Sequence, residues 1–195
     1  MRFALALLLV CLLFVCSLAA TARAQSSLGP QTLREIGIDQ RIGEQLPLDL
    51  TFVDENGKQV KLGRYFGKRP VVLALVYNAC PMLCHQVLEG MMGSLHTLEL
   101  DAGRDFDVLV VSFDPKEEPS VARAVRDKLV QRYARKGSEG AFHVLTGEPE
   151  PIRRLTEAVG FRYKYDDKLG QYAHPSALFV LTPNGKLARY FFGAE

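Results

Sequence analysis

Apolar and polar residues follow two different periods along residues 48–192, and these periods predict alternating strands and helices. Runs that are apolar throughout, or apolar at every second position, predict strands over 48–53, 59–62, 71–77, 105–113, 142–145, 161–165, 177–181 and 187–192. Asn-Gly pairs at 56–57 and 184–185 predict hairpin turns between the strands that flank them. Apolar residues three or four apart predict helices over 81–99, 120–136 and 151–159, with a short helix over 31–36.

The second of these helices carries Val121, Val125 and Leu129 at four-residue spacing, and we expect this stripe to face the core. Gly160 predicts the end of the third helix. Strand, helix, strand and helix followed by a closing hairpin imply a mixed sheet with helices on both faces. We therefore expect an α/β fold of the thioredoxin-like kind with an N-terminal β-hairpin. Such a fold would normally add one more helix after residue 192, so we expect a fragment or a trimmed end.

The beginning of the chain has the pattern of an export signal over residues 1–24. Arg2 precedes a long apolar stretch, and small residues before Ala24 form a cleavage site. We expect cleavage after Ala24; the alternative is an uncleaved membrane anchor, because the apolar stretch is near spanning length. Residues 25–46 are expected to form a tether and residues 47–195 the folded domain. The protein is then periplasmic, either free or held at the membrane by its first residues alone.

Charge and cysteine content narrow the function classes. The chain has 24 Lys and Arg against 22 Asp and Glu, and removing residues 1–24 removes two basic residues and no acidic one. The remainder has 22 of each sign, which argues against a nucleic-acid-binding protein, since these have a basic surplus. Two of the four cysteines lie in the export signal, so the rest of the chain is not a small disulfide scaffold. We expect a monomer.

Cys80 and Cys84 follow the apolar strand 71–77 at the point where the chain turns into the next helix. Pro81 suits the first turn of that helix, and the two cysteines lie on one face of it. The helix N-terminus favours thiolates. Two thiolates at this spacing can close a disulfide, which makes them candidate catalytic residues if they are redox-active. They can also hold a soft ion such as copper(I), with an imidazole completing the ligand set.

The third ligand has to come from one of four histidines. His85 adjoins Cys84 but points about 100° away around the helix. His96 is about three turns further along, and His143 lies in a short apolar strand where we expect it to be packed. His174 stands in a loop before the final hairpin, where the fold is expected to return beside the helix start. We therefore expect His174 to be the imidazole ligand.

Three segments together resemble the Sco/SenC family of copper-binding proteins: Tyr-Asn-Ala-Cys-Pro-Met-Leu-Cys at 77–84, Ser-Phe-Asp-Pro at 112–115, and His174 before the strand and Asn-Gly turn at 178–185. The resemblance runs from about residue 48 to residue 192. It implies a thioredoxin fold, copper bound as Cu(I) or Cu(II) by Cys80, Cys84 and His174, and a disulfide-capable oxidised state. It also implies a role in assembling the copper centre of cytochrome c oxidase, with the oxidase copper subunit or another copper chaperone as the partner.

Two functions remain open at this point. The first is an exported copper metallochaperone, which is not an enzyme. The second is a thiol–disulfide oxidoreductase that reduces the cysteines of a partner, for which Cys80 and Cys84 suffice and His174 is incidental. A peroxiredoxin would need a Thr and an Arg around its reactive cysteine, and neither flanks Cys80.

Overall fold

The computed structural model describes residues 34–78 and 83–193, except for the side chains of residues 83–85. The strands are β1 (Gly37–Ile38), β2 (Thr51–Asp54), β3 (Gln59–Lys61), β4 (Val71–Val76), β5 (Asp107–Ser112), β6 (Phe142–Thr146), β7 (Phe161–Arg162), β8 (Lys164–Asp166), β9 (Gln171–Ala173), β10 (Ala177–Leu181) and β11 (Leu187–Phe192). The helices are η1 (Leu62–Tyr65), α3 (Leu83–Thr97), α4 (Pro119–Tyr133), η2 (Glu139–Ala141) and α5 (Pro149–Ala158).

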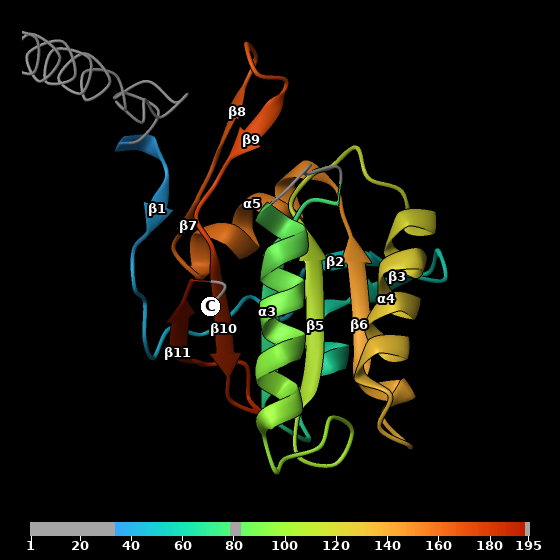
Figure 1. Ribbon diagram of the computed structural model, residues 1–195. Helices are drawn as coiled ribbons and strands as arrows, with labels where there is room; N and C mark the ends of the chain where they lie inside the picture. The colour runs from blue at the N-terminus through green and yellow to red at the C-terminus, as the bar shows by residue number, and fades with distance from the viewer. Residues whose placement is uncertain (1–33, 79–82, 194–195) are drawn as a thin grey trace, which may run out of the picture. The chain divides into compact units, whose positions relative to one another are not determined.

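Seven strands form one mixed sheet in the order β11-β10-β4-β5-β6-β2-β3. The central strands β4, β5 and β6 are parallel, while the pairs on both sides of them are antiparallel. Helices α3 and α4 cover one face of this sheet and α5 lies behind it (Figure 1). The prediction of a mixed thioredoxin-like sheet with helices on both faces and an N-terminal hairpin, β2–β3, is confirmed.

The apolar runs predicted as strands 71–77 and 105–113 form β4 and β5, which lie at the centre of the core. Every residue of β5 is buried and five of the six residues of β4 are buried. Parallel strands that are covered by helices on both faces exclude water from both sides, so an unbroken apolar run is the sequence that fits them.

The predicted apolar stripe of α4 was partly wrong. Ala122, Leu129 and Tyr133 are the buried residues of this helix, whereas Val121 is 37% exposed. A spacing of four residues exceeds the 3.6-residue turn, so each step moves about 40° around the helix and Val121 falls off the core-facing side. The helix also ends at Tyr133, three residues before the predicted end, where Ala134 takes a left-handed conformation with φ 52°.

The predicted strand 161–165 is divided into two. Residues 161–162 pair with β1, while residues 164–166 pair with β9 in a separate two-stranded sheet. The β8–β9 hairpin projects away from the seven-stranded sheet (Figure 1). The sequence prediction did not include β1 or β9, and it did not separate β8 from β7. The pairing partner of each of these strands is not marked by any local pattern.

The described part of the segment expected to be a tether packs against the domain. Leu46 is 2% exposed, and the Gly43 N–H donates a hydrogen bond to the Leu187 carbonyl at 2.7 Å. The Asp39 N–H likewise donates to the Gly160 carbonyl at 2.9 Å. This segment therefore adds a layer along the edge strand β11 and the end of α5. No helix in the described part of the chain is both long and apolar enough to cross a membrane.

Candidate metal centre

The segment that carries Cys80 and Cys84 follows β4 in sequence, and His174 lies in the loop between β9 and β10. Cys80 lies outside the described residues, and Cys84 is described only as the second residue of α3. His174 is described in full and follows β9 directly. Its imidazole packs against Tyr77, which stands three residues before Cys80 in sequence.

His174 is a buried imidazole with a defined tautomer. The residue is 9% exposed, and its Nδ1 lies 2.9 Å from the Pro175 carbonyl oxygen. A carbonyl can only accept a hydrogen bond, so Nδ1 carries the proton and Nε2 carries the lone pair in the neutral ring. Burial lowers the pKa of His174 from its ordinary value, and the bond to Pro175 partly opposes this shift. The ring is thus held in the neutral form that a metal ion binds.

Aromatic rings enclose this imidazole. The ring centroids of Phe113 and Tyr77 lie 5.2 Å and 5.6 Å from that of His174, both in edge-to-face geometry. Phe161 contributes a third ring at 6.3 Å. The rings fix the plane of the imidazole by packing, while their burial removes the water that would otherwise compete for Nε2.

Strand pairing explains why His174 lies beside Tyr77. Strand β10 begins three residues after His174 and runs antiparallel to β4, with Leu178 opposite Ala74. Tyr77 is 3% exposed and follows the last residue of β4. The two residues are almost a hundred positions apart in sequence, and the β4–β10 pair brings them together at one end of the sheet.

Glu117 is a site residue that sequence reasoning missed. Its Oε1 accepts a hydrogen bond from the Asn78 backbone N–H, and its Oε2 accepts one from the Asn78 side-chain amide at 2.6 Å. The carboxylate therefore binds both the backbone N–H and the side-chain amide of Asn78, which stands two positions before Cys80. No periodicity or motif marks Glu117, because it lies in an irregular loop and its partner is 39 residues away.

Asp114 lies in the loop after β5 and accepts two hydrogen bonds through one carboxylate oxygen. Its Oδ1 accepts a hydrogen bond from the Lys116 N–H at 2.9 Å, which closes a turn within its own loop. The same oxygen accepts a long bond of 3.4 Å from the Tyr172 hydroxyl of β9. Asp114 therefore stabilises its loop and, through Tyr172, contacts β9, the strand that precedes His174.

A hollow of about 370 Å³ opens between this loop and the β8–β9 hairpin. It is lined by Tyr77, Asp114, Lys116, Tyr165, Leu169, Gly170, Gln171 and Tyr172. Burial and, to a smaller extent, the charge of Asp114 raise the pKa of Tyr172 to about 12. Its hydroxyl therefore stays protonated and remains a donor. The hollow shares Tyr77 with the surroundings of His174.

His96 and His143, the other histidines with described side chains, make contacts that stabilise the fold. His96 stands near the end of α3 with Nε2 3.0 Å from the Arg132 carbonyl oxygen. His143 is packed in β6 with its ring centroid 4.6 Å from that of Tyr65, in agreement with the prediction that it is a packed residue. Within residues 34–78 and 83–193, no group of three or more His, Cys, Asp or Glu side chains is arranged to hold a metal ion. The prediction of a three-ligand site depends on Cys80 and Cys84, so it remains a prediction.

The sequence matches the profile of the SCO1/SenC family over residues 39–195. No curated protein matches the chain. In fold, the chain is similar to a protein of Aquifex aeolicus VF5, with a TM-score of 0.68 and 24% identity over 79% of this chain and 86% of that one. It is similar to Arabidopsis thaliana ScoI with copper bound, with a TM-score of 0.61 and 17% identity over 80% and 90% of the two chains. It is also similar to BsSco, a Sco-family cytochrome c oxidase assembly protein with a disulfide switch, with a TM-score of 0.59 and 19% identity over 80% and 88%.

Proposed function

Because the chain belongs to the SCO1/SenC family, we propose that it is a copper metallochaperone that holds its cargo through Cys80, Cys84 and His174. Copper is the metal bound in the ScoI structure of Arabidopsis thaliana. Two thiolates and one imidazole form a donor set that suits copper in its reduced state, where soft sulfur ligands are preferred. Copper is cargo in this proposal and leaves the protein by exchange onto the ligands of a partner.

The observation that carries the proposal is the state of His174. Its Nδ1 donates to the Pro175 carbonyl, so Nε2 is the ring nitrogen that would coordinate a metal, and its ring is packed against Tyr77. Metal-bound histidines in proteins are oriented in this way by a hydrogen bond from the other ring nitrogen. Tyr77 stands only three residues before Cys80 in sequence, so the imidazole packs against the residue from which the chain continues to the first cysteine.

Copper loading depends on the oxidation state of the cysteine pair. Metal binding requires both thiols without their protons, so a disulfide between Cys80 and Cys84 has no sulfur ligand to offer. A partner dithiol restores the site by two-electron exchange: its two thiols form a disulfide as the Cys80–Cys84 bond breaks and two thiols are regenerated. The disulfide switch of BsSco supports this part of the proposal.

A Cu(I) titration tests the ligand set. The reduced protein is titrated in competition with a chromophoric chelator such as bathocuproine disulfonate, and we expect one copper ion per chain. Cys84→Ser and His174→Ala should each weaken the affinity by at least about 10-fold, since even a residue that only orients a ligand has an effect of that size. His96→Ala is the matched control because its imidazole lies at the other end of α3. Unchanged affinity in Cys84→Ser or His174→Ala would contradict the ligand assignment.

For the recipient, we propose the copper subunit of cytochrome c oxidase or a second copper chaperone. BsSco is named as an oxidase assembly protein of this family, which supports this choice of partner. Residues 1–24 have the pattern of an export signal, so we place the protein in the periplasm, either released or anchored by that segment. N-terminal sequencing of the purified protein tests this: a chain that begins at Gln25 indicates cleavage, and an intact Met1 indicates an anchor.

A thiol–disulfide oxidoreductase is the second candidate, and the disulfide switch of BsSco favours it equally. The two functions differ in their need for His174. Reduction of a partner disulfide uses the cysteine pair alone, so His174→Ala should retain it, whereas copper transfer should fail in the same variant. Measuring both activities on one variant therefore separates the two functions.

A further inference from the structure

One loop contacts both halves of the proposed copper site. Residues 114–118 connect β5 to α4, and this loop reaches the cysteine side through Glu117 and the histidine side through Asp114. The two contacts are made by residues three positions apart in the same turn.

On the cysteine side, the contact is a two-point hydrogen bond. The carboxylate of Glu117 accepts from the backbone and from the side chain of Asn78. Hydrogen bonds to an ionised acceptor are about twice as strong as neutral ones, and two of them to one residue fix its orientation as well as its position. The residue fixed in this way is the last described residue before the cysteine segment.

On the histidine side, the contact passes through the β8–β9 hairpin. The Tyr172 hydroxyl donates to Asp114 Oδ1 at 3.4 Å, and the Lys116 ammonium lies 5.5 Å from the ring centroid of Tyr165. Tyr172 also packs its ring edge against Tyr77 at 5.2 Å. Tyr172 precedes Ala173 and His174, so the position of this strand sets the position of the imidazole.

Between these two contacts the loop is internally closed. The Glu117 N–H donates to the Asp114 carbonyl at 3.2 Å, and the Lys116 N–H donates to Asp114 Oδ1 at 2.9 Å. The Asp114 N–H in turn donates to the Ser112 hydroxyl at 3.2 Å, which ties the turn to the end of β5. A turn with these bonds has few ways to lengthen, so Asp114 and Glu117 keep a nearly constant separation.

We propose that the turn Asp114–Glu117 sets the distance between His174 and Asn78, the residue that leads into the cysteine segment, with Glu117 and Asp114 acting as positioning residues. This rests on the proposed function for its consequence, because the distance matters only if both halves bind one ion. Neither residue touches the metal in this proposal. Their effect is to hold the donors ready, so that copper binding does not have to order them.

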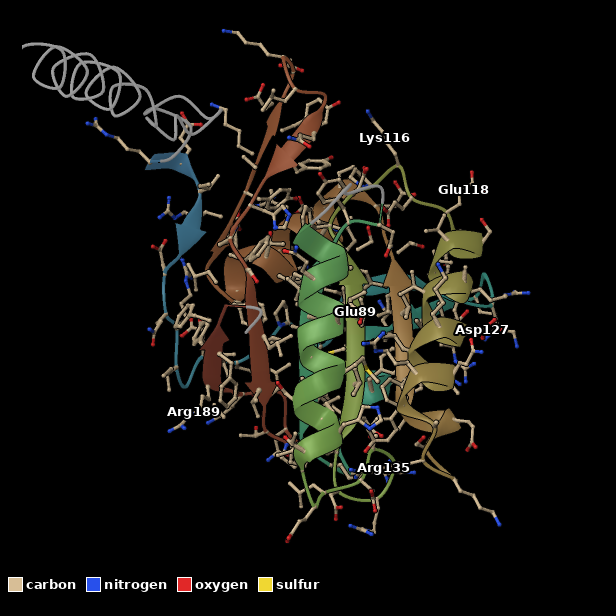
Figure 2. The ribbon with its side chains drawn as sticks, in the orientation of Figure 1. Glu89, Lys116, Glu118, Asp127, Arg135 and Arg189 are labelled. Carbon is tan, nitrogen blue, oxygen red and sulfur yellow. The ribbon has the colours of Figure 1, made fainter. Side chains whose placement is uncertain are left out.

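The test compares adjacent glutamates. Glu117→Ala removes both bonds to Asn78, and Glu117→Gln retains one acceptor oxygen and the side-chain volume. Glu118→Ala is the matched control, since Glu118 has the same charge, makes no side-chain bond to the start of α4 and extends outward from the loop (Figure 2). We expect Glu117→Ala to weaken Cu(I) binding about 10-fold or more, Glu117→Gln to be intermediate and Glu118→Ala to match the wild type. Equal affinities for Glu117→Ala and Glu118→Ala would overturn the proposal.

A second variant tests whether one turn joins the two halves. Tyr172→Phe removes the hydroxyl bond to Asp114 while it keeps the ring that packs against Tyr77. Residues of one network have non-additive effects, so the loss in Tyr172→Phe/Glu117→Gln should be smaller than the product of the two single losses. The thiolate-to-Cu(II) absorption band should also shift in each single variant. Losses that multiply would show two independent contacts and would refute a joining role for the turn.

A metal-free measurement separates this proposal from the proposed function. Exchange of the Asn78 backbone amide with solvent deuterium, followed by NMR on the copper-free protein, should be faster in Glu117→Ala and Glu117→Gln than in Glu118→Ala. If that holds but Cys84→Ser binds copper like the wild type, the ligand assignment fails while the contact stands. If the amide exchanges at the same rate in these three variants and in the wild type, the positioning role of Glu117 is wrong whatever the metal does. Should Glu117→Ala fail to fold in a thermal melt, Glu117→Gln carries each comparison.

Discussion

The ring of Tyr77 meets the ring of His174 edge-on, with centroids 5.6 Å apart and planes at 84°. This contact joins the end of β4 to the loop that follows β9. An edge-to-face pair adds a modest attraction to the area it buries, and its directional character also fixes the orientation of the imidazole plane.

Replacing Tyr77 should therefore weaken copper binding. Tyr77→Leu keeps an apolar residue but removes the ring edge, and we expect about a 10-fold loss of Cu(I) affinity in chelator competition. Tyr65→Leu is the matched control, because Tyr65 is also buried but packs against His143 in another part of the sheet. Both variants should lower the melting temperature, but only Tyr77→Leu should lower the affinity. A loss of affinity in both would mean that general destabilisation is the cause.

Stability should fall as the solution becomes acidic. Burial lowers the pKa of His143 and of His174 in the folded protein below the ordinary 6.5. Between each lowered pKa and 6.5 the unfolded chain binds more protons than the folded one, so the free energy of unfolding rises with pH in that window and is lost as pH falls. Each histidine contributes at most about 1.4 kcal/mol per pH unit.

His143→Gln isolates one of the two contributions. Urea unfolding of the copper-free protein between about pH 7.5 and pH 5.5 should show a shallower decline in this variant than in the wild type. Identical slopes would mean that His143 takes up a proton in the folded protein as readily as in the unfolded chain.

The hydroxyl of Tyr190 tests whether residues before 47 belong to the fold. It accepts a hydrogen bond from the Arg41 N–H at 2.7 Å and donates one to the Val159 carbonyl at 3.0 Å. Tyr190→Phe leaves both backbone groups without this partner, and we expect a loss of about 1–3 kcal/mol in the free energy of unfolding. Tyr165→Phe, at a residue that is 40% exposed, should have little effect. Equal stabilities of the two variants would show that the Tyr190 hydroxyl contributes nothing measurable through these two bonds.

A single methyl group at Gly160 should disrupt the contact with Asp39. Gly160 has φ +66°, and a Cβ atom there would lie 1.9 Å from the Asp39 carbonyl oxygen. Both the left-handed backbone and the clash disfavour alanine, so we expect Gly160→Ala to lose more than about 2 kcal/mol of stability. Gly140→Ala is the control, since an added Cβ meets no atom within 4 Å there. Amide exchange in β1 should accelerate only in the first variant.

Local patterns predicted the parts of this fold that depend on neighbouring residues. The Asn184-Gly185 turn joins β10 to β11 as expected, since its chemistry lies within the turn itself, where Gly185 has φ +78°. The pairing of Gly37 with Arg162 was not predicted, because a two-residue strand has no period to detect. Glu117 was missed for a related reason: its role is defined by a partner in another element, and a glutamate in a polar loop looks like any solvated charge.

Strand β4 connects to both sides of the proposed site. Its carboxyl end leads toward the cysteine segment, while its edge pairs with β10, the strand that begins just after His174. Because β4 and β10 are hydrogen-bonded neighbours, a displacement of β4 would carry β10 with it. Fraying at the periphery, in β1 or β3, can proceed without reaching this pair. If the ligands are those proposed, fraying of the outer strands would leave the copper site intact, and release of the ion would be driven by a competing partner.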